Sequence, residues 1–183
     1  MSRLFVILLA FVLSQQIVKA QVSFDPVDGC LNVFDVSAGK GFGESGSDII
    51  SAQYLHERFI NEQFCVGLGV GYCYLNSCQF SAIPVFISSH YFFLDKSISP
   101  FVNTRAGVYW PVGVNSNQSG VNLYLAPSAG VKLHITPRIG ILASLGYDAY
   151  LQKTHNSVKN GYQTRVVSNL DIGLGVCFQI PGW

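Results

Sequence analysis

Charged side chains are scarce in this chain. Asp, Glu, Lys and Arg together make up 11% of its 183 residues, whereas hydrophobic residues make up 49%. The surface of a water-soluble protein is ordinarily about a quarter to a third charged. The deficit therefore argues against an ordinary soluble exterior and favours an outer surface that contacts lipid.

Long hydrophobic runs and an excess of basic residues are also missing. No segment after residue 20 has 18 consecutive apolar residues, which excludes a helical membrane protein. Of the 11 Lys and Arg residues, Arg3 and Lys19 lie in the first 20 positions, so 9 remain against 10 Asp and Glu. Without a basic surface, nucleic acid is not an expected partner.

The first 20 residues have the pattern of a secretory signal peptide. Arg3 gives a positive start, residues 4–13 are apolar, and Ala20 offers a small residue for cleavage. The apolar run is shorter than the ~20 residues of a spanning helix, although an uncleaved N-terminal anchor is the alternative. We expect residues 1–20 to be removed and residues 21–183 to form one exported domain.

Alternation of apolar with small or polar residues is clearest over residues 139–152. Apolar side chains occupy the odd positions from Ile139 to Leu151, whereas the even positions include Gly140 and Asp148. Successive side chains of a strand point to opposite faces, so this is a strand with one apolar face. The pattern predicts eight strands, at residues 31–42, 49–59, 64–75, 80–94, 100–112, 121–135, 139–152 and 164–178.

The connections between these strands alternate in character. Three are short, at residues 61–63, 95–99 and 136–138. The others are longer or rich in Gly, Ser and Asn, at residues 43–48, 76–78, 113–120 and 153–163. Outer-membrane barrels have short periplasmic turns and longer external loops. We therefore predict an all-β fold, an eight-stranded antiparallel up-and-down transmembrane β-barrel in the bacterial outer membrane.

Charges of both signs fall on the inward phase of these strands. The predicted lumen network consists of Asp35, Glu57, His90, Arg105, Lys132, Asp148 and Asp171. Buried charges must be paired, and an eight-stranded barrel is just wide enough for its side chains to fill it. A packed polar plug is favoured over a narrow polar path or a catalytic cluster.

Aromatic residues supply a second set of candidates, because they collect where a barrel wall crosses the membrane interfaces. The predicted interface residues are Tyr54, Tyr72, Tyr91, Tyr109, Trp110 and Tyr147. Cys73 and Cys78 flank a short connection and are a possible disulfide, since export permits oxidation. The histidines are scattered and no Cys-x-x-Cys occurs, so no metal site is expected.

A lipid-modifying enzyme and a soluble lipocalin-like barrel are the two alternative functional classes. A lipid-modifying enzyme would use Ser, His and acidic groups, and the candidates are Ser88, Ser89, His90, His56 and Glu57. A triad is recognised by geometry, which spacing does not supply. A secreted lipocalin-like barrel would need its apolar face inside and a charged exterior. No cofactor is expected, because the glycines at residues 41–46 precede a strand and not a helix.

Residues 91–102, YFFLDKSISPFV, followed by AGVY at 106–109, resemble small outer-membrane β-barrel proteins of Bacteroidetes. FCVGLGVGY at 64–72, LAPSAGV at 125–131 and LGY at 145–147 follow the same pattern. The resemblance implies an OmpA/OmpX-like barrel and carries no catalytic residues. We expect a monomer without enzymatic activity, with outer-membrane lipid around its wall and an unidentified ligand or partner at its external loops.

Overall fold

The computed structural model describes residues 29–41, 46–76, 80–112, 121–156 and 161–181. The described residues form eight strands: β1 (Gly29–Gly41), β2 (Ile49–Phe59), β3 (Phe64–Leu75), β4 (Phe80–Phe92), β5 (Ile98–Val112), β6 (Asn122–His134), β7 (Ile139–Asn156) and β8 (Gly161–Pro181). Within these ranges, no helix is long and apolar enough to cross a membrane. The predicted signal segment, residues 1–20, lies outside the described part of the chain.

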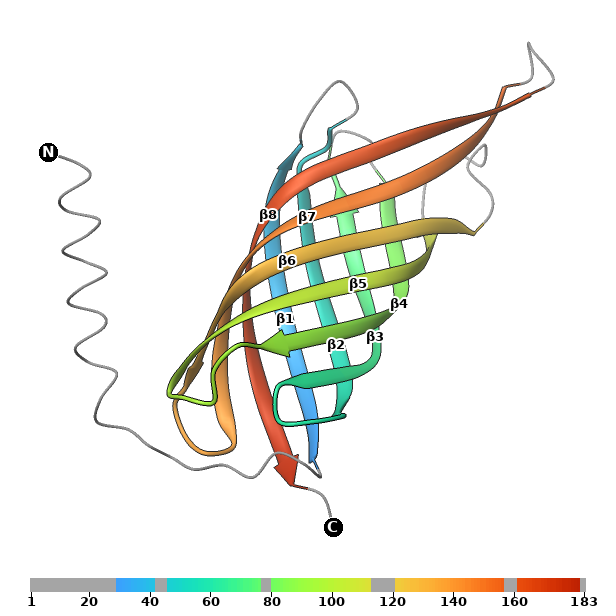
Figure 1. Cartoon of the computed structure of the whole chain (residues 1–183). Helices are drawn as coiled ribbons and strands as arrows, with labels where there is room; N and C mark the ends of the chain where they lie inside the picture. Colours follow the sequence, from blue (N-terminus) through green and yellow to red (C-terminus); the bar gives the residue numbers. More distant parts are fainter. Residues whose placement is uncertain (1–28, 42–45, 77–79, 113–120, 157–160, 182–183) are drawn as a thin grey trace, which may run out of the picture.

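Each strand pairs antiparallel with its neighbour in the chain, and β1 pairs with β8 to close the barrel (Figure 1). The β1–β8 register matches Asp35 with Gly175 and Val33 with Cys177. The beginning of β1 and the end of β8 therefore lie at one end of the barrel. The three shorter connections lie at the same end, as the prediction required.

Two of these short turns are closed by side chains that replace missing backbone partners. Asn61 Oδ1 accepts hydrogen bonds from the backbone N–H groups of Gln63 and Phe64, at 2.9 and 2.8 Å. Thr136 Oγ1 accepts one from Ile139 N at 3.0 Å between β6 and β7. Asn and Thr favour turns because their side chains bond nearby backbone groups.

The hairpin of β7 and β8 extends beyond the other strands at the opposite end of the barrel (Figure 1). The register continues from Gln152 opposite Arg165 to Asn156 opposite Gly161. The expectation of a loop over residues 153–163 was therefore wrong at both of its ends. An antiparallel hairpin satisfies its own backbone hydrogen bonds, so polar composition does not stop strand pairing there. Residues 157–160 and the predicted loop at residues 113–120 lie outside the described residues.

The barrel places its large hydrophobic side chains on the outside and its polar side chains inside, the reverse of a soluble protein. Large hydrophobic residues face outward on every strand and include Leu68, Leu145 and Leu174, whose exposed fractions are 65%, 67% and 61%. The inward positions bury most of the charged and amide side chains of the strands. A lipocalin-like barrel needs the reverse distribution, so that alternative is wrong.

Candidate functional site

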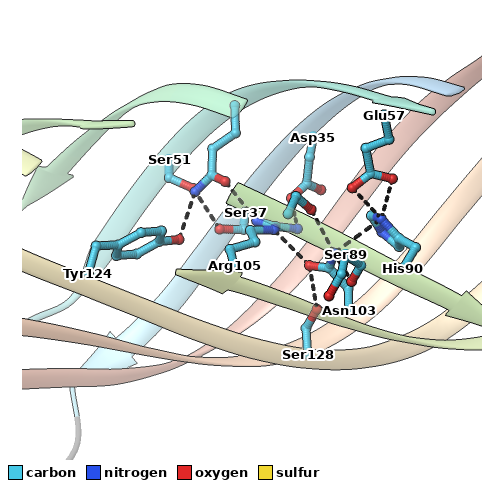
Figure 2. A network of polar contacts seen from close by, with 12 residues as sticks. Asp35, Ser37, Ser51, Glu57, Ser89, His90, Asn103, Arg105, Tyr124 and Ser128 are labelled. Carbon is cyan, nitrogen blue, oxygen red and sulfur yellow. Dashed lines mark hydrogen bonds and ion pairs between the residues drawn. The ribbon is translucent and has the colours of Figure 1, made fainter. Parts of the chain in front are cut away.

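A continuous polar network occupies the middle of the lumen, with Arg105 of β5 at its centre (Figure 2). One guanidinium nitrogen forms an ion pair with Asp35 Oδ2 at 2.9 Å, and another donates to Gln53 Oε1 at 2.8 Å. Gln53 Nε2 in turn donates to the hydroxyl of Tyr124 at 3.3 Å. Arg105 thereby ties together β1, β2, β5 and β6.

Asn103 connects this arginine to a second buried pair. Its Oδ1 accepts from Arg105 Nε at 2.9 Å, which fixes the orientation of the amide. Its Nδ2 donates to Ser88 Oγ at 2.9 Å and lies 3.1 Å from His90 Nδ1. His90 Nδ1 lies 2.7 Å from Glu57 Oε2, and the two residues form the second ion pair of the lumen when His90 is protonated (Figure 2).

Cys65 completes the Glu57 end of the network. Its thiol donates to Glu57 Oε2 at 3.1 Å. Cys65 lies on β3, directly opposite His90 on β4, while Glu57 lies on β2 opposite Gly67. The side chains of Glu57, Cys65 and His90 are 0%, 0% and 2% exposed. Three adjacent strands thus place a carboxylate, a thiol and an imidazole close together in the buried interior.

The remaining charged residues of the predicted network are also buried, and they lie at its edges: Asp148 hydrogen-bonds Tyr124, and Asp171 hydrogen-bonds Ser37. Asp148 and Asp171 lie on β7 and β8, in the half of the lumen toward the long hairpin. Lys132 lies near the short turns, with Nζ 4.8 Å from the centroid of the Phe92 ring. The structure therefore brings Asp35, Arg105, Glu57 and His90 together and leaves the other three around them.

Three tyrosines fill the lumen toward the long hairpin. Tyr150 packs edge-to-face on Tyr109, with ring centroids 5.2 Å apart, and lies 5.1 Å from Tyr124. Tyr109 was predicted at the membrane interface and is instead fully buried, at 0% exposure. That placement was wrong because Tyr109 and Trp110 are consecutive in β5 and point to opposite faces.

The other predicted interface aromatics lie on the outer wall. Tyr54, Tyr72, Tyr91, Trp110 and Tyr147 are half-buried or exposed there. Tyr72 hydroxyl bonds Ser81 Oγ at 2.6 Å, and Tyr91 hydroxyl donates to Gln63 Oε1 at 2.8 Å. Their role as membrane girdles stays a prediction.

Of the possible Cys73–Cys78 disulfide, the structure describes only Cys73. Cys73 is a free, buried cysteine whose thiol donates to Ala82 O at 3.5 Å. Its side chain points into the lumen, toward the backbone of β4. Cys78 lies outside the described residues.

The candidates for a lipid-modifying enzyme do not assemble into an accessible triad. Ser88 Oγ accepts a hydrogen bond from Asn103, and both Ser88 and His90 are buried in the lumen. His56 points to the outer wall and bonds Asn32 Oδ1 at 2.8 Å. A nucleophile must also reach its substrate, and Ser88, Glu57 and His90 are all buried in the lumen.

The predicted lumen network left out the neutral residues that take part in it. Gln53, Asn103 and Tyr124 all take part in its hydrogen bonds. Their positions were visible, since Asn103 is two residues before Arg105 and Gln53 is in phase with Glu57. Charge alone was the wrong criterion, because buried amides and phenols also need partners.

A closed eight-stranded barrel with a polar, filled lumen and an apolar outer wall has the fold of small outer-membrane β-barrels. Among solved structures the chain is similar to Neisserial surface protein A from Neisseria, with a TM-score of 0.62 and 16% identity over 82% of this chain and 96% of that one. It is also similar to OprG from Pseudomonas aeruginosa, with a TM-score of 0.55 and 10% identity over 85% and 97% of the two chains. These identities establish the fold alone. No family model matches the chain, and no curated protein matches its sequence.

Proposed function

We propose that the protein is a non-enzymatic, integral outer-membrane β-barrel that acts as a plugged scaffold for surface-exposed loops. The single observation that carries this proposal is the inversion of its side chains, with the large hydrophobic residues outside and the ion pairs within. Lipid solvates such an exterior, whereas water would not. In this proposal residues 1–20 are removed during export. The barrel then inserts into a bacterial outer membrane, as in the Bacteroidetes barrels that the sequence resembles.

A scaffold role is favoured over transport because side chains block the lumen at two levels. Tyr109, Tyr124 and Tyr150 fill the half toward the long hairpin. Phe92 and Phe101 pack around His90 in the other half, with ring centroids 5.7 and 5.3 Å from the imidazole. The loop end, including the β7–β8 hairpin, is then the surface left for a ligand or partner. The partners are outer-membrane lipid and an unidentified surface ligand, and the protein acts as a monomer.

Ionic conductance across planar lipid bilayers tests whether the side chains close the lumen. The wild-type barrel is expected to show no steady single-channel conductance, because its interior is only wide enough for the side chains it holds. The measurement is current at fixed voltage after insertion of folded protein, with boiled protein as the baseline. A large, stable open level in the wild type would contradict the plugged lumen.

The lipid-facing wall is tested by Leu145→Arg. Leu145 lies in the middle of the spanning part of β7 and is 67% exposed. On the surface of a soluble protein this change would hardly alter the free energy of unfolding. Near the bilayer midplane it is expected to lower the free energy of unfolding by about 2–4 kcal/mol. The measurement is denaturant unfolding in lipid vesicles, followed by the difference in gel mobility between folded and boiled protein.

Ile60→Arg is the matched control, because Ile60 is 63% exposed but lies in the turn between β2 and β3. Its expected cost is below about 1 kcal/mol, as at the membrane interface. Wild type and Ile60→Arg should both be recovered in the outer-membrane fraction. Equal costs for the two changes, or recovery of the wild type in the soluble periplasm, would contradict the membrane assignment.

A further inference from the structure

We infer that Glu57, Cys65 and His90 form a binding site for one divalent transition-metal ion of the Zn²⁺ type, inside the barrel wall. Their ligand atoms all lie within 4.8 Å of one another, and all three side chains are buried. This inference concerns the interior of the protein and does not depend on the role proposed for the loops.

The chemistry of the three donors matches ions of this class. Thiolate, imidazole and carboxylate are the side chains that bind Zn²⁺ in proteins, at about 2.0–2.3 Å from the metal. Mg²⁺ and Ca²⁺ prefer oxygen ligands alone, so the sulfur and nitrogen donors discriminate against them. Two of the three groups are anionic when bound, which neutralises a divalent charge in a buried site.

The backbone holds the donors at nearly the required spacing. Glu57 Oε2 lies 2.7 Å from His90 Nδ1 and 3.1 Å from Cys65 Sγ. Ligands of a tetrahedral ion are roughly 3.3–3.8 Å apart, given metal–ligand bonds of 2.0–2.3 Å. The pairing of β2, β3 and β4 fixes the three Cα positions. Side-chain movements of less than about 1 Å would therefore bring the three ligand atoms to the spacing that the ion requires.

Neighbouring groups hold the histidine in place for this role. The imidazole ring stacks on Phe92 with an interplanar angle of 5° and also packs on Phe101. Asn103 lies beside Nδ1, and its own orientation is set by Arg105. The two rings therefore fix the plane of the imidazole. Asn103 contacts the ligating nitrogen itself, so the ion would displace this contact, and Asn103 Nδ2 keeps its hydrogen bond to Ser88 Oγ.

Binding replaces hydrogen bonds with metal bonds and releases a proton. The ion takes the place of the thiol hydrogen between Cys65 and Glu57, and that proton leaves to solvent. Nδ1 of His90 gives up the hydrogen that it shares with Glu57, this hydrogen moves to Nε2 of the neutral ring, and the freed lone pair of Nδ1 binds the ion. The carboxylate is already ionised. One proton is therefore released per ion, and three protein ligands leave a fourth position for water or Ser88 Oγ.

The test uses the full mature chain, refolded in detergent, treated with a chelator and free of any histidine tag. Zn²⁺ titration by calorimetry in two buffers of different ionisation enthalpy measures stoichiometry and proton release. Co²⁺ serves as the spectroscopic probe, because a bound thiolate produces a charge-transfer absorption band. We expect one equivalent of Zn²⁺, about one proton released, and the charge-transfer band.

Cys65→Ser is the decisive variant, since its hydroxyl still donates to Glu57 and preserves the fold. It should abolish the charge-transfer band and the proton release, and weaken Zn²⁺ binding by roughly 100-fold or more, beyond the 10–100-fold loss typical of an outer partner. Cys177→Ser is the matched control, because Cys177 is another free, buried thiol of the lumen. It should behave as wild type.

The outcomes that overturn the inference are equally definite. Wild-type protein that binds no Zn²⁺ and gives no Co²⁺ charge-transfer band would show that the three residues form only a hydrogen-bonded cluster. A band that persists in Cys65→Ser but disappears in Cys177→Ser would place the metal elsewhere. Gel mobility before and after boiling verifies that every variant tested is folded.

Discussion

Replacing Arg105 with alanine is expected to lower the free energy of unfolding of the barrel by about 3–5 kcal/mol. The change leaves Asp35 buried without its ion-pair partner and also removes hydrogen bonds to Gln53 and Asn103. Asp148 and Asp171 are buried in the same lumen and lose the same neighbouring cation. Denaturant unfolding in lipid vesicles, followed by Trp fluorescence and gel mobility, measures the loss.

Two further variants separate lost charge pairing from lost volume. Asp35→Asn in the Arg105→Ala background removes the stranded charge and should recover part of the stability, since replacing both partners of a buried pair is often nearly neutral. Arg58→Ala removes an arginine exposed on the outer wall and should change stability by less than about 1 kcal/mol. An Arg105→Ala cost no larger than that of Arg58→Ala would show that the network does not stabilise the lumen.

Gly67→Ala is expected to destabilise the barrel by about 3 kcal/mol or more, at or above the upper end of ordinary overpacking. A Cβ at Gly67 would overlap the carbonyl oxygen of His56 and lie 2.5 Å from the Cα of Glu57. These are backbone atoms of β2, the strand paired with Gly67, so no side-chain rotation relieves the clash. The yield of heat-modifiable protein and its unfolding midpoint measure the effect.

Gly175→Ala is the matched control, because Gly175 also points into the lumen from a spanning strand. The nearest atom to a Cβ there is Phe34 O at 3.2 Å, so a shift of a few tenths of an ångström suffices. Its expected cost is below about 1 kcal/mol. Equal costs at Gly67 and Gly175 would mean that the close approach of β2 and β3 relaxes without penalty.

The strands were predictable because their signal is local. Alternation with a period of two residues identifies a strand and its two faces wherever it occurs. The bounds of β2 and β3 were predicted correctly, and the other strands differ from prediction mainly at their ends. The end of β7 was missed because alternation fades outside the membrane, whereas the backbone pairing of a hairpin continues without it.

The candidate site was predictable only as a list of inward residues. Phase placed Asp35, Glu57, His90 and Arg105 in the lumen but gave no partners. In the structure, Glu57 Oε1 lies 2.9 Å from His90, 33 positions away in sequence, and Asp35 bonds Arg105 across 70 positions. Such pairs depend on the register and stagger of a closed barrel, which no local pattern records.

The sequence alone determined that this chain is an eight-stranded barrel with an apolar wall and a charged interior, because each strand carries that information in its own alternation. Only the tertiary structure decided which charges meet, that Tyr109 lies in the lumen, and that Cys65 converges with Glu57 and His90. Spacing in the sequence indicated no metal site. Adjacent strands brought the three ligands together because closure of the barrel sets the height of each residue relative to those on the neighbouring strands.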